Sequence, residues 1–178
     1  NISASLGSYS GLASLAGIGL SSGSDDSNAL KATKKLTSLS FFEKNILTNI
    51  FLPDLMAVKS WNFETNTLAY DESIYKTNSN TWVRDYSHPK QQIPSAQESF
   101  EVFTTEHLSL SEDKQSGFIT LSVKHQSPFV AKEWAVLVIN EVNAFYRQKD
   151  KLESEKAVSY LNLQISMTGL SEIKQVLA

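Results

Sequence analysis

The chain of 178 residues contains no cysteine. This absence excludes disulfide frameworks, catalysis by a thiol and zinc sites built on cysteine ligands. It does not point to a compartment, because a cysteine-free protein is compatible with a reducing cytoplasm and with an oxidising periplasm.

Long apolar runs and basic runs are also missing. The longest apolar run, Trp134 to Ile139, has six residues, whereas a helix that spans a bilayer needs about 20. Sixteen lysines and arginines against nineteen acidic residues give a net charge of −3, which argues against nucleic acid as a partner. The chain begins without methionine and ends inside a helical pattern, so we expect it to be part of a longer protein.

Glycine is concentrated at one end of the chain. Five of the seven glycines precede residue 28, among many serines and regularly spaced leucines. Glycine and serine alone predict a flexible coil, whereas the leucines favour a segment that lies on a surface or packs with a neighbouring subunit; both alternatives stay open. We therefore divide the chain into this Gly/Ser-rich segment, 1–27, a base domain, 28–147, and the start of an extended helical arm, 148–178.

The rest of the chain has an ordinary globular composition, and its patterns predict an α+β base domain with a small mixed sheet. Cap residues and apolar spacing predict three helices in its first part. The first carries Ala29, Leu30, Thr33 and Leu36; the second carries Phe41, Phe42, Ile46, Leu47 and Ile50 and is ended by Pro53; the third is opened by Pro94-Ser95 and runs from Ala96 to Glu106.

Between Met56 and Pro94 lies a stretch rich in Asn, Thr and Ser, which predicts an excursion with short strand-like or turn pieces. Aromatic residues in such a stretch raise the possibility of carbohydrate binding. Their irregular spacing favours a simpler interpretation, in which they anchor a long loop to its own domain. These residues are Trp61, Phe63, Trp82 and Tyr86.

The clearest pattern in the chain is a β-hairpin followed directly by a helix. Apolar and polar residues alternate from Leu108 to Asp113 and from Phe118 to His125, which predicts two strands and a turn. Ser127 and Pro128 then suit the cap and first position of a helix that we expect to reach Met167. Its apolar stripe has Trp134, Leu137, Val138 and Phe145 as core anchors, and Val136 and Ile139 widen it.

The second half of this helix has a different character. Arg147 to Lys156 offers only Leu152 to any core, so the helix is predicted to protrude from the base domain. Beyond it, Val158, Leu161 and Ile165 recur at three- and four-residue spacing. These three are our candidates for oligomerisation, because a return helix or a neighbouring subunit would have to cover them.

No motif in the sequence points to catalysis. The three histidines lie far apart, without the spacing that puts two metal ligands on one helix face, and neither a nucleophile elbow nor a phosphate-binding loop is present. We therefore expect no enzymatic activity, no cofactor and no metal. A polysaccharide-processing enzyme that uses carboxylates of the Met56 to Pro94 stretch remains the alternative from another class.

Several stretches resemble the bacterial polysaccharide chain-length determinants, the Wzz-type polysaccharide co-polymerases. The resemblance extends over nearly the whole chain. It is carried by Gly11 to Ile18, Phe41-Phe42-Glu43, Leu52 to Leu55, Ser111 to Val123, His125 to Pro128, Ala131 to Trp134, Ile139 to Asn143, Arg147 to Asp150 and Glu155 to Leu161.

This resemblance implies a periplasmic, membrane-proximal domain of a bacterial inner-membrane protein, with a long helix rising from it and with membrane helices outside the present chain. It implies a homo-oligomeric ring that sets the length of O-antigen or a related surface polysaccharide beside a separate polymerase, and possibly contacts the growing glycan. The alternative within the family is a capsule or exopolysaccharide co-polymerase with a tyrosine kinase domain. The truncated chain would lack the family's first strand, return segment and last strand.

Overall fold

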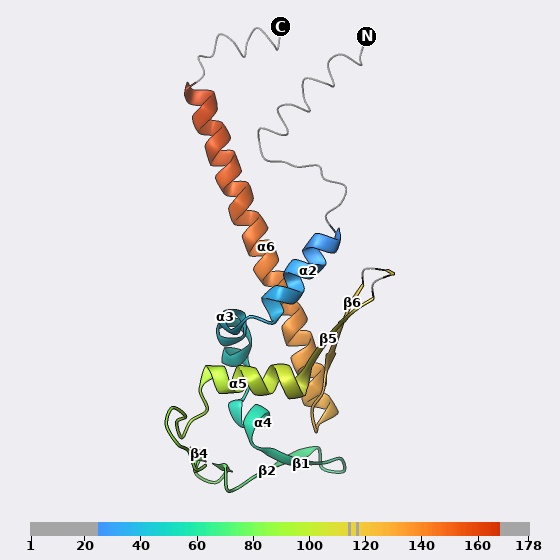
Figure 1. Cartoon of the computed structure of the whole chain (residues 1–178), viewed down its shortest axis with the longest axis vertical. Helices are drawn as coiled ribbons and strands as arrows, with labels where there is room; N and C mark the ends of the chain where they lie inside the picture. The colour runs from blue at the N-terminus through green and yellow to red at the C-terminus, as the bar shows by residue number, and fades with distance from the viewer. Residues whose placement is uncertain (1–24, 114, 117, 168–178) are drawn as a thin grey trace. The chain divides into compact units, whose positions relative to one another are not determined.

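The computed structural model describes residues 25–113, 115–116 and 118–167 (Figure 1). It has the α+β fold class predicted from the sequence: short helices and small antiparallel sheets precede a long helix. The chain divides into two compact units, of which one is Asp25–Asn143 and the other includes Ala144 onward. Most of the Gly/Ser-rich segment, 1–24, lies outside the described residues, as do 168–178 of the predicted arm.

The first helix, α2 (Asp25–Leu36), lies where the sequence predicts it. The second predicted helix is split into α3 (Leu39–Phe41), a π-helix η1 (Phe42–Ile46) and a 3₁₀ turn η2 (Leu47–Asn49). Pro53 does not end this helix, contrary to our prediction. It lies in the first turn of the next helix, α4 (Leu52–Met56), where a missing N–H breaks no helical hydrogen bond.

Two hairpins follow where the sequence predicts only short strand-like pieces. β1 (Val58–Asn62) pairs with β2 (Thr67–Tyr70), and β3 (Tyr75–Lys76) pairs with β4 (Thr81–Trp82). Each connecting turn contains an asparagine with φ of 51°, Asn66 in the first and Asn80 in the second. Asparagine tolerates this left-handed backbone conformation better than most residues, so it supports the turns.

Buried aromatic side chains hold this region only in part as predicted. Trp82 is half-buried, and its ring contacts that of buried Tyr75 at 5.2 Å between centroids. Phe63 and Tyr86 are exposed, so the prediction that they anchor the excursion is wrong. Tyr75 is the anchor that the sequence analysis missed; it also contacts the rings of Phe51 and Tyr70.

Arg84 fastens the following loop. Its guanidinium donates two hydrogen bonds to the carboxylate of Glu98, at 2.9 and 3.1 Å, and further bonds to the carbonyl oxygens of Gln91 and Gln92. Glu98 also accepts a bond from the backbone N–H of Ser95 and so completes a capping box at the start of α5. These bonds, with Arg84 first, lower the pKa of Glu98 to about 2.

α5 (Ala96–Val102) begins at the predicted residue and packs against α3, α4 and η1. The predicted helix continues to His107, but its last part, η3 (Phe103–His107), is a second π-helix. The first residues of the two π-helices, Phe42 and Phe103, are both buried, with ring centroids 5.1 Å apart. These rings form the centre of the core.

β5 (Leu108–Glu112) and β6 (Ile119–Val123) form the predicted hairpin, with Leu108 opposite Val123 and Leu110 opposite Leu121. All three sheets among the described residues are two-stranded and antiparallel, instead of one small mixed sheet. α6 then runs from Pro128 to Met167, the bounds that the sequence predicts. Its first turns lie beside the β5–β6 hairpin (Figure 1).

The buried stripe of α6 is narrower than predicted. Trp134 and Val138, one turn apart, are buried, whereas Leu137 and Phe145 are half-buried. Val136 and Ile139 are exposed, so the prediction that they widen the stripe is wrong. Successive helical residues are about 100° apart, so Val136 points about 200° away from Trp134. One layer of core covers only one side of this helix.

Candidate functional site

The candidate oligomerisation residues lie on the part of α6 that belongs to the second unit. Val158, Leu161 and Ile165 are between 41% and 56% exposed. Residues three and four positions apart are neighbours on a helix surface, so these side chains form one continuous aliphatic stripe. Leu163 and Tyr160 are also exposed nearby in the sequence. We call Val158, Leu161 and Ile165 the distal stripe.

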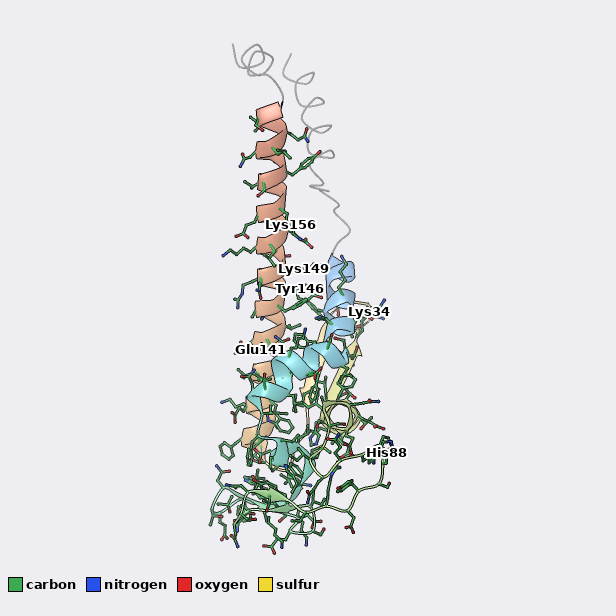
Figure 2. The ribbon with its side chains drawn as sticks, turned by 90° about the vertical axis from the view of Figure 1, so that its left-hand side faces the viewer. Lys34, His88, Glu141, Tyr146, Lys149 and Lys156 are labelled. Atoms are coloured by element: carbon green, nitrogen blue, oxygen red, sulfur yellow. The ribbon has the colours of Figure 1, made fainter. Side chains whose placement is uncertain are left out.

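The polar stretch before the distal stripe is stabilised by pairs within the helix itself. Lys149 pairs with Glu153 at 3.6 Å, and Lys151 pairs with Glu155 at 3.9 Å. Figure 2 shows Lys149 and Lys156 on α6. Exposed pairs of this kind contribute only about 0.3–0.5 kcal/mol each. The stretch therefore forms a solvated helix and has no groups that converge on a site.

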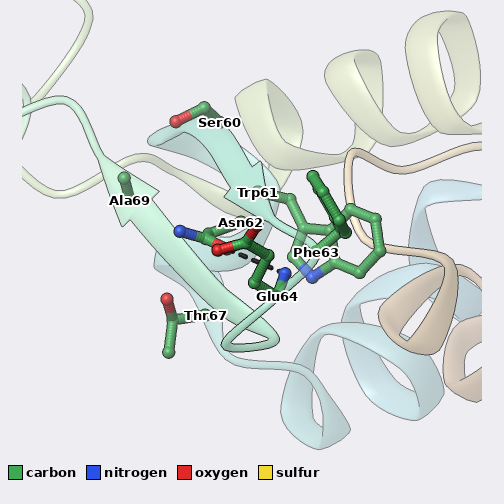
Figure 3. A pocket seen from close by; sticks show the side chains of 7 residues that line it. All are labelled: Ser60, Trp61, Asn62, Phe63, Glu64, Thr67 and Ala69. Carbon is green, nitrogen blue, oxygen red and sulfur yellow. Dashed lines mark hydrogen bonds between the residues drawn. The ribbon is translucent and has the colours of Figure 1, made fainter.

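The base unit carries a groove on its β1–β2 hairpin. The groove has a volume of about 510 Å³ (Figure 3). Its lining consists of Ser60, Trp61, Asn62, Phe63, Glu64, Thr67 and Ala69. Ser60 pairs with Ala69 and Asn62 pairs with Thr67, so these four residues share one face of the hairpin. We call this feature the hairpin groove.

The turn beside the hairpin groove is held by side chains. The Oδ1 atom of Asn62 accepts hydrogen bonds from the backbone N–H groups of Glu64, at 2.9 Å, and Thr65, at 3.2 Å. The indole N–H of Trp61 donates to Oδ1 of Asn66 at 2.9 Å. These bonds define the backbone that presents Phe63 and Glu64, because the asparagine side chains replace backbone partners in the turn.

Aromatic rings surround this turn. Phe63 is 75% exposed. Trp61 is half-buried, and its ring lies 6.3 Å from that of Phe129, which is also exposed in the first turn of α6. The sequence analysis lists Trp61 and Phe63 but assigns them to packing; Phe129, next to Pro128, is missed because it precedes the apolar stripe.

A second cluster forms where β5, β6 and α6 meet. His107 and His125, which the sequence analysis treats as unrelated, have ring centroids 5.7 Å apart, and both contact the ring of Trp134. The hairpin register explains this, because Leu108 opposite Val123 brings the ends of both strands together. The spacing between the two histidines across a predicted hairpin was the signal that could have revealed the pair.

The hydrogen bonds of these histidines define their protonation. His125 Nδ1 accepts from the Ser127 N–H at 3.0 Å, so Nε2 carries the proton and donates to the Asp54 carbonyl at 3.0 Å. His107 Nδ1 donates to the Lys124 carbonyl at 2.7 Å. Burial lowers the pKa of His107, and its neighbour His125 adds to this effect. Both rings thus join neighbouring elements as neutral groups.

Within the described part of the chain, no group of three or more acidic or histidine side chains is arranged to hold a metal ion. None of the described helices combines the length and hydropathy needed to cross a membrane.

Comparisons with known proteins leave the chain without a relative: no family model, no curated protein and no solved structure matches it.

Proposed function

We propose that this chain is a periplasmic domain of a bacterial inner-membrane protein that regulates the length of O-antigen or a related surface polysaccharide. It acts as a homo-oligomeric scaffold beside a separate polymerase and catalyses no reaction itself. The observation that carries the proposal is the distal stripe of α6, which exposes Val158, Leu161 and Ile165 on a helix of 40 residues. The sequence resemblance to the chain-length determinants supplies the biological setting.

The distal stripe supports self-association for an energetic reason. Burying one aliphatic side chain stabilises a complex by roughly 1.5–3 kcal/mol, so covering all three would contribute several kcal/mol. Surface aliphatic residues are common singly, but a row on one helix face indicates a partner surface. The polar stretch before the row, with its i,i+4 ion pairs, does not compete for that partner.

The α+β fold class agrees with what the resemblance implies for such proteins, and it supports the proposal without deciding it. The hairpin, the Ser127-Pro128 helix start and the long helix lie in the stretches that carry the resemblance.

Deletion of the parent gene tests this function. Cells without the gene should still polymerise their surface polysaccharide but should lose its preferred length, which a gel of the purified polysaccharide displays as an unregulated distribution. Re-expression of the complete gene should restore the preferred length. A gel with only single repeat units would make the protein a polymerase component, and an unchanged distribution would reject the proposal.

A further inference from the structure

The hairpin groove combines side chains that the scaffold function does not use. Phe63 is 75% exposed beside it, so packing within the base unit does not account for its position. The lining adds hydroxyl groups from Ser60 and Thr67, the amide of Asn62 and the carboxylate of Glu64 (Figure 3). An aromatic ring next to several hydrogen-bonding groups matches the two-sided chemistry of a sugar.

A pyranose ring presents C–H bonds on its faces and hydroxyl groups at its edge. The C–H bonds carry partial positive charge and pack well on an aromatic face, which carries partial negative charge. The hydroxyl groups donate to a carboxylate and exchange hydrogen bonds with amides and other hydroxyls. Phe63 supplies the first kind of contact, and Glu64 with Asn62 supplies the second.

We propose that the hairpin groove binds one or two units of a neutral or N-acetylated pyranose glycan. The ring of one unit stacks on Phe63, and its hydroxyl groups bond to Glu64, Asn62 and Thr67. The volume of about 510 Å³ lies within the range of about 300–1,000 Å³ that small-ligand sites occupy. The inference deepens the proposed function and rests on it, because the glycan in question would be the surface polysaccharide itself.

The charge of the lining selects among ligands. Glu64 is the charged residue of the groove lining, with no lysine or arginine beside it. A carboxylate repels anionic sugars and the phosphate groups of anionic lipids, and it accepts hydrogen bonds from neutral hydroxyls. This observation favours a neutral glycan over a membrane surface as the occupant of the groove.

The groove is also preorganised for binding. Asn62 uses its Oδ1 atom to hold the turn, through the N–H groups of Glu64 and Thr65. Because the turn is already formed, little backbone entropy is lost when a ligand binds. The ring contact of Trp61 with Phe129 connects this hairpin to the start of α6.

Saturation-transfer difference NMR on the purified chain tests the proposal, with chitotriose and maltotriose as neutral probes at millimolar concentration. The wild-type chain should transfer magnetisation to at least one of the two trisaccharides. Phe63→Ala should abolish the transfer, and Glu64→Gln should weaken it. Phe118→Ala is the matched control, because Phe118 has the same residue type and the same exposed fraction, 75%, on a different hairpin; it should leave the transfer unchanged.

Transfer that is absent from the wild-type chain with both probes, or equal in wild type and Phe63→Ala, would overturn the proposal. So would sedimentation with phosphatidylethanolamine–phosphatidylglycerol vesicles that depends on Phe63 without any transfer to sugar, since it would assign the surface to a membrane. Circular dichroism checks that each variant is folded. The measurement is independent of the gene deletion: glycan binding with an unchanged length distribution would reject the proposed function alone.

Discussion

Trp134 joins more parts of the base unit than any other aromatic residue described above. Its ring contacts those of Phe103 at 5.9 Å, His107 at 5.3 Å and His125 at 4.9 Å. These partners come from η3, from the end of that π-helix and from the segment after β6. One side chain therefore links α6 to both the helical and the hairpin parts of the core.

Trp134→Ala should destabilise the chain by roughly 3–5 kcal/mol, the range for truncating a large buried aromatic side chain. The residue is only 3% exposed, so the substitution leaves a cavity. Urea unfolding measures the loss. Val136→Ala is the control on the same helix, because Val136 is exposed and should change the free energy of unfolding by no more than about 0.5 kcal/mol. An unchanged midpoint for Trp134→Ala would contradict the assigned core.

Arg84 and Glu98 make the second residue-scale test. Both side chains are largely buried, at 15% and 16% exposed. Arg84→Met removes the bidentate partner of the carboxylate and should cost roughly 1.5–3 kcal/mol at neutral pH, the range for a hydrogen bond to a charged group. Urea unfolding at pH 7 measures this, with Glu101→Gln as the control on an exposed position of the same helix.

The same pair predicts an acid dependence. The pKa of Glu98 falls from 4.5 to about 2 on folding. A lowered carboxyl pKa contributes stability that is complete above 4.5 and is lost as the pH falls toward 2. The difference in unfolding free energy between wild type and Arg84→Met should therefore shrink between pH 5 and pH 2. A difference that stays constant over this range would show that the pair does not lower the pKa.

At the residue scale, periodicity predicts which side of a helix is apolar but not how much of it is covered. Trp134 and Val138 are buried, whereas Val136 and Ile139 are equally apolar and exposed. The missing information is the number of layers packed on the helix, which depends on residues distant in sequence. Tyr75 was missed for a related reason: its ring partners Phe51 and Trp82 come from other elements.

At the scale of elements, the junction of the β5–β6 hairpin with α6 depends on two neutral imidazoles. His107 bonds to the Lys124 carbonyl, and His125 bridges the Asp54 carbonyl and the Ser127 N–H. A proton on His125 Nδ1 would place two donors against each other. The junction is therefore built for the neutral form of both rings.

Acid should weaken this junction. The pKa of His107 is lowered from 6.5, mainly by burial and further by His125, while Glu106 and the Lys124 carbonyl oppose the shift. Below pH 6.5 the unfolded chain binds a proton that the folded chain does not, so stability falls as the pH decreases through this window. One histidine limits the slope to about 1.4 kcal/mol per pH unit. NMR titration of the imidazole protons should place the midpoint of His107 below 6.5, and a midpoint above that value would contradict the burial argument.

Elements with strong local signals were predicted well, and elements without them were not. The β5–β6 hairpin and the bounds of α6 follow from alternation, from the turn and from Ser127-Pro128. β3 and β4 have two residues each, too few for a period to appear. The hairpin groove was hidden for the same reason, because register places Asn62 beside Thr67 and composition does not. Asn66 and Asn80 were the available turn signals.

At the scale of the whole molecule, the distal stripe should control assembly. Leu161→Asp places a charge in the middle of the stripe, where burial against a partner would require its desolvation. In the complete protein this variant should weaken the cross-linked oligomer in membranes and broaden the polysaccharide length distribution. Leu161 is 41% exposed, so the base domain should stay folded.

Two controls make the assembly experiment specific. Glu153→Gln changes the exposed polar stretch of the same helix and should leave the oligomer intact. Limited proteolysis shows whether the base domain of Leu161→Asp remains folded. Oligomers and glycan lengths like those of the wild type in Leu161→Asp would show that the distal stripe is not an assembly surface.

The two π-helices carry a consequence for the ancestry of this chain. A π-helix closes its hydrogen bonds one residue later than an α-helix and commonly occurs as a single turn within one. Loss of one residue from Phe103–His107 would let the segment revert to an α-helix and would rotate everything after it by about 100°. β5 would then present its other face to the core. Descendants that have lost a residue here must also have changed their hairpin register, so length differences among relatives should occur in correlated pairs.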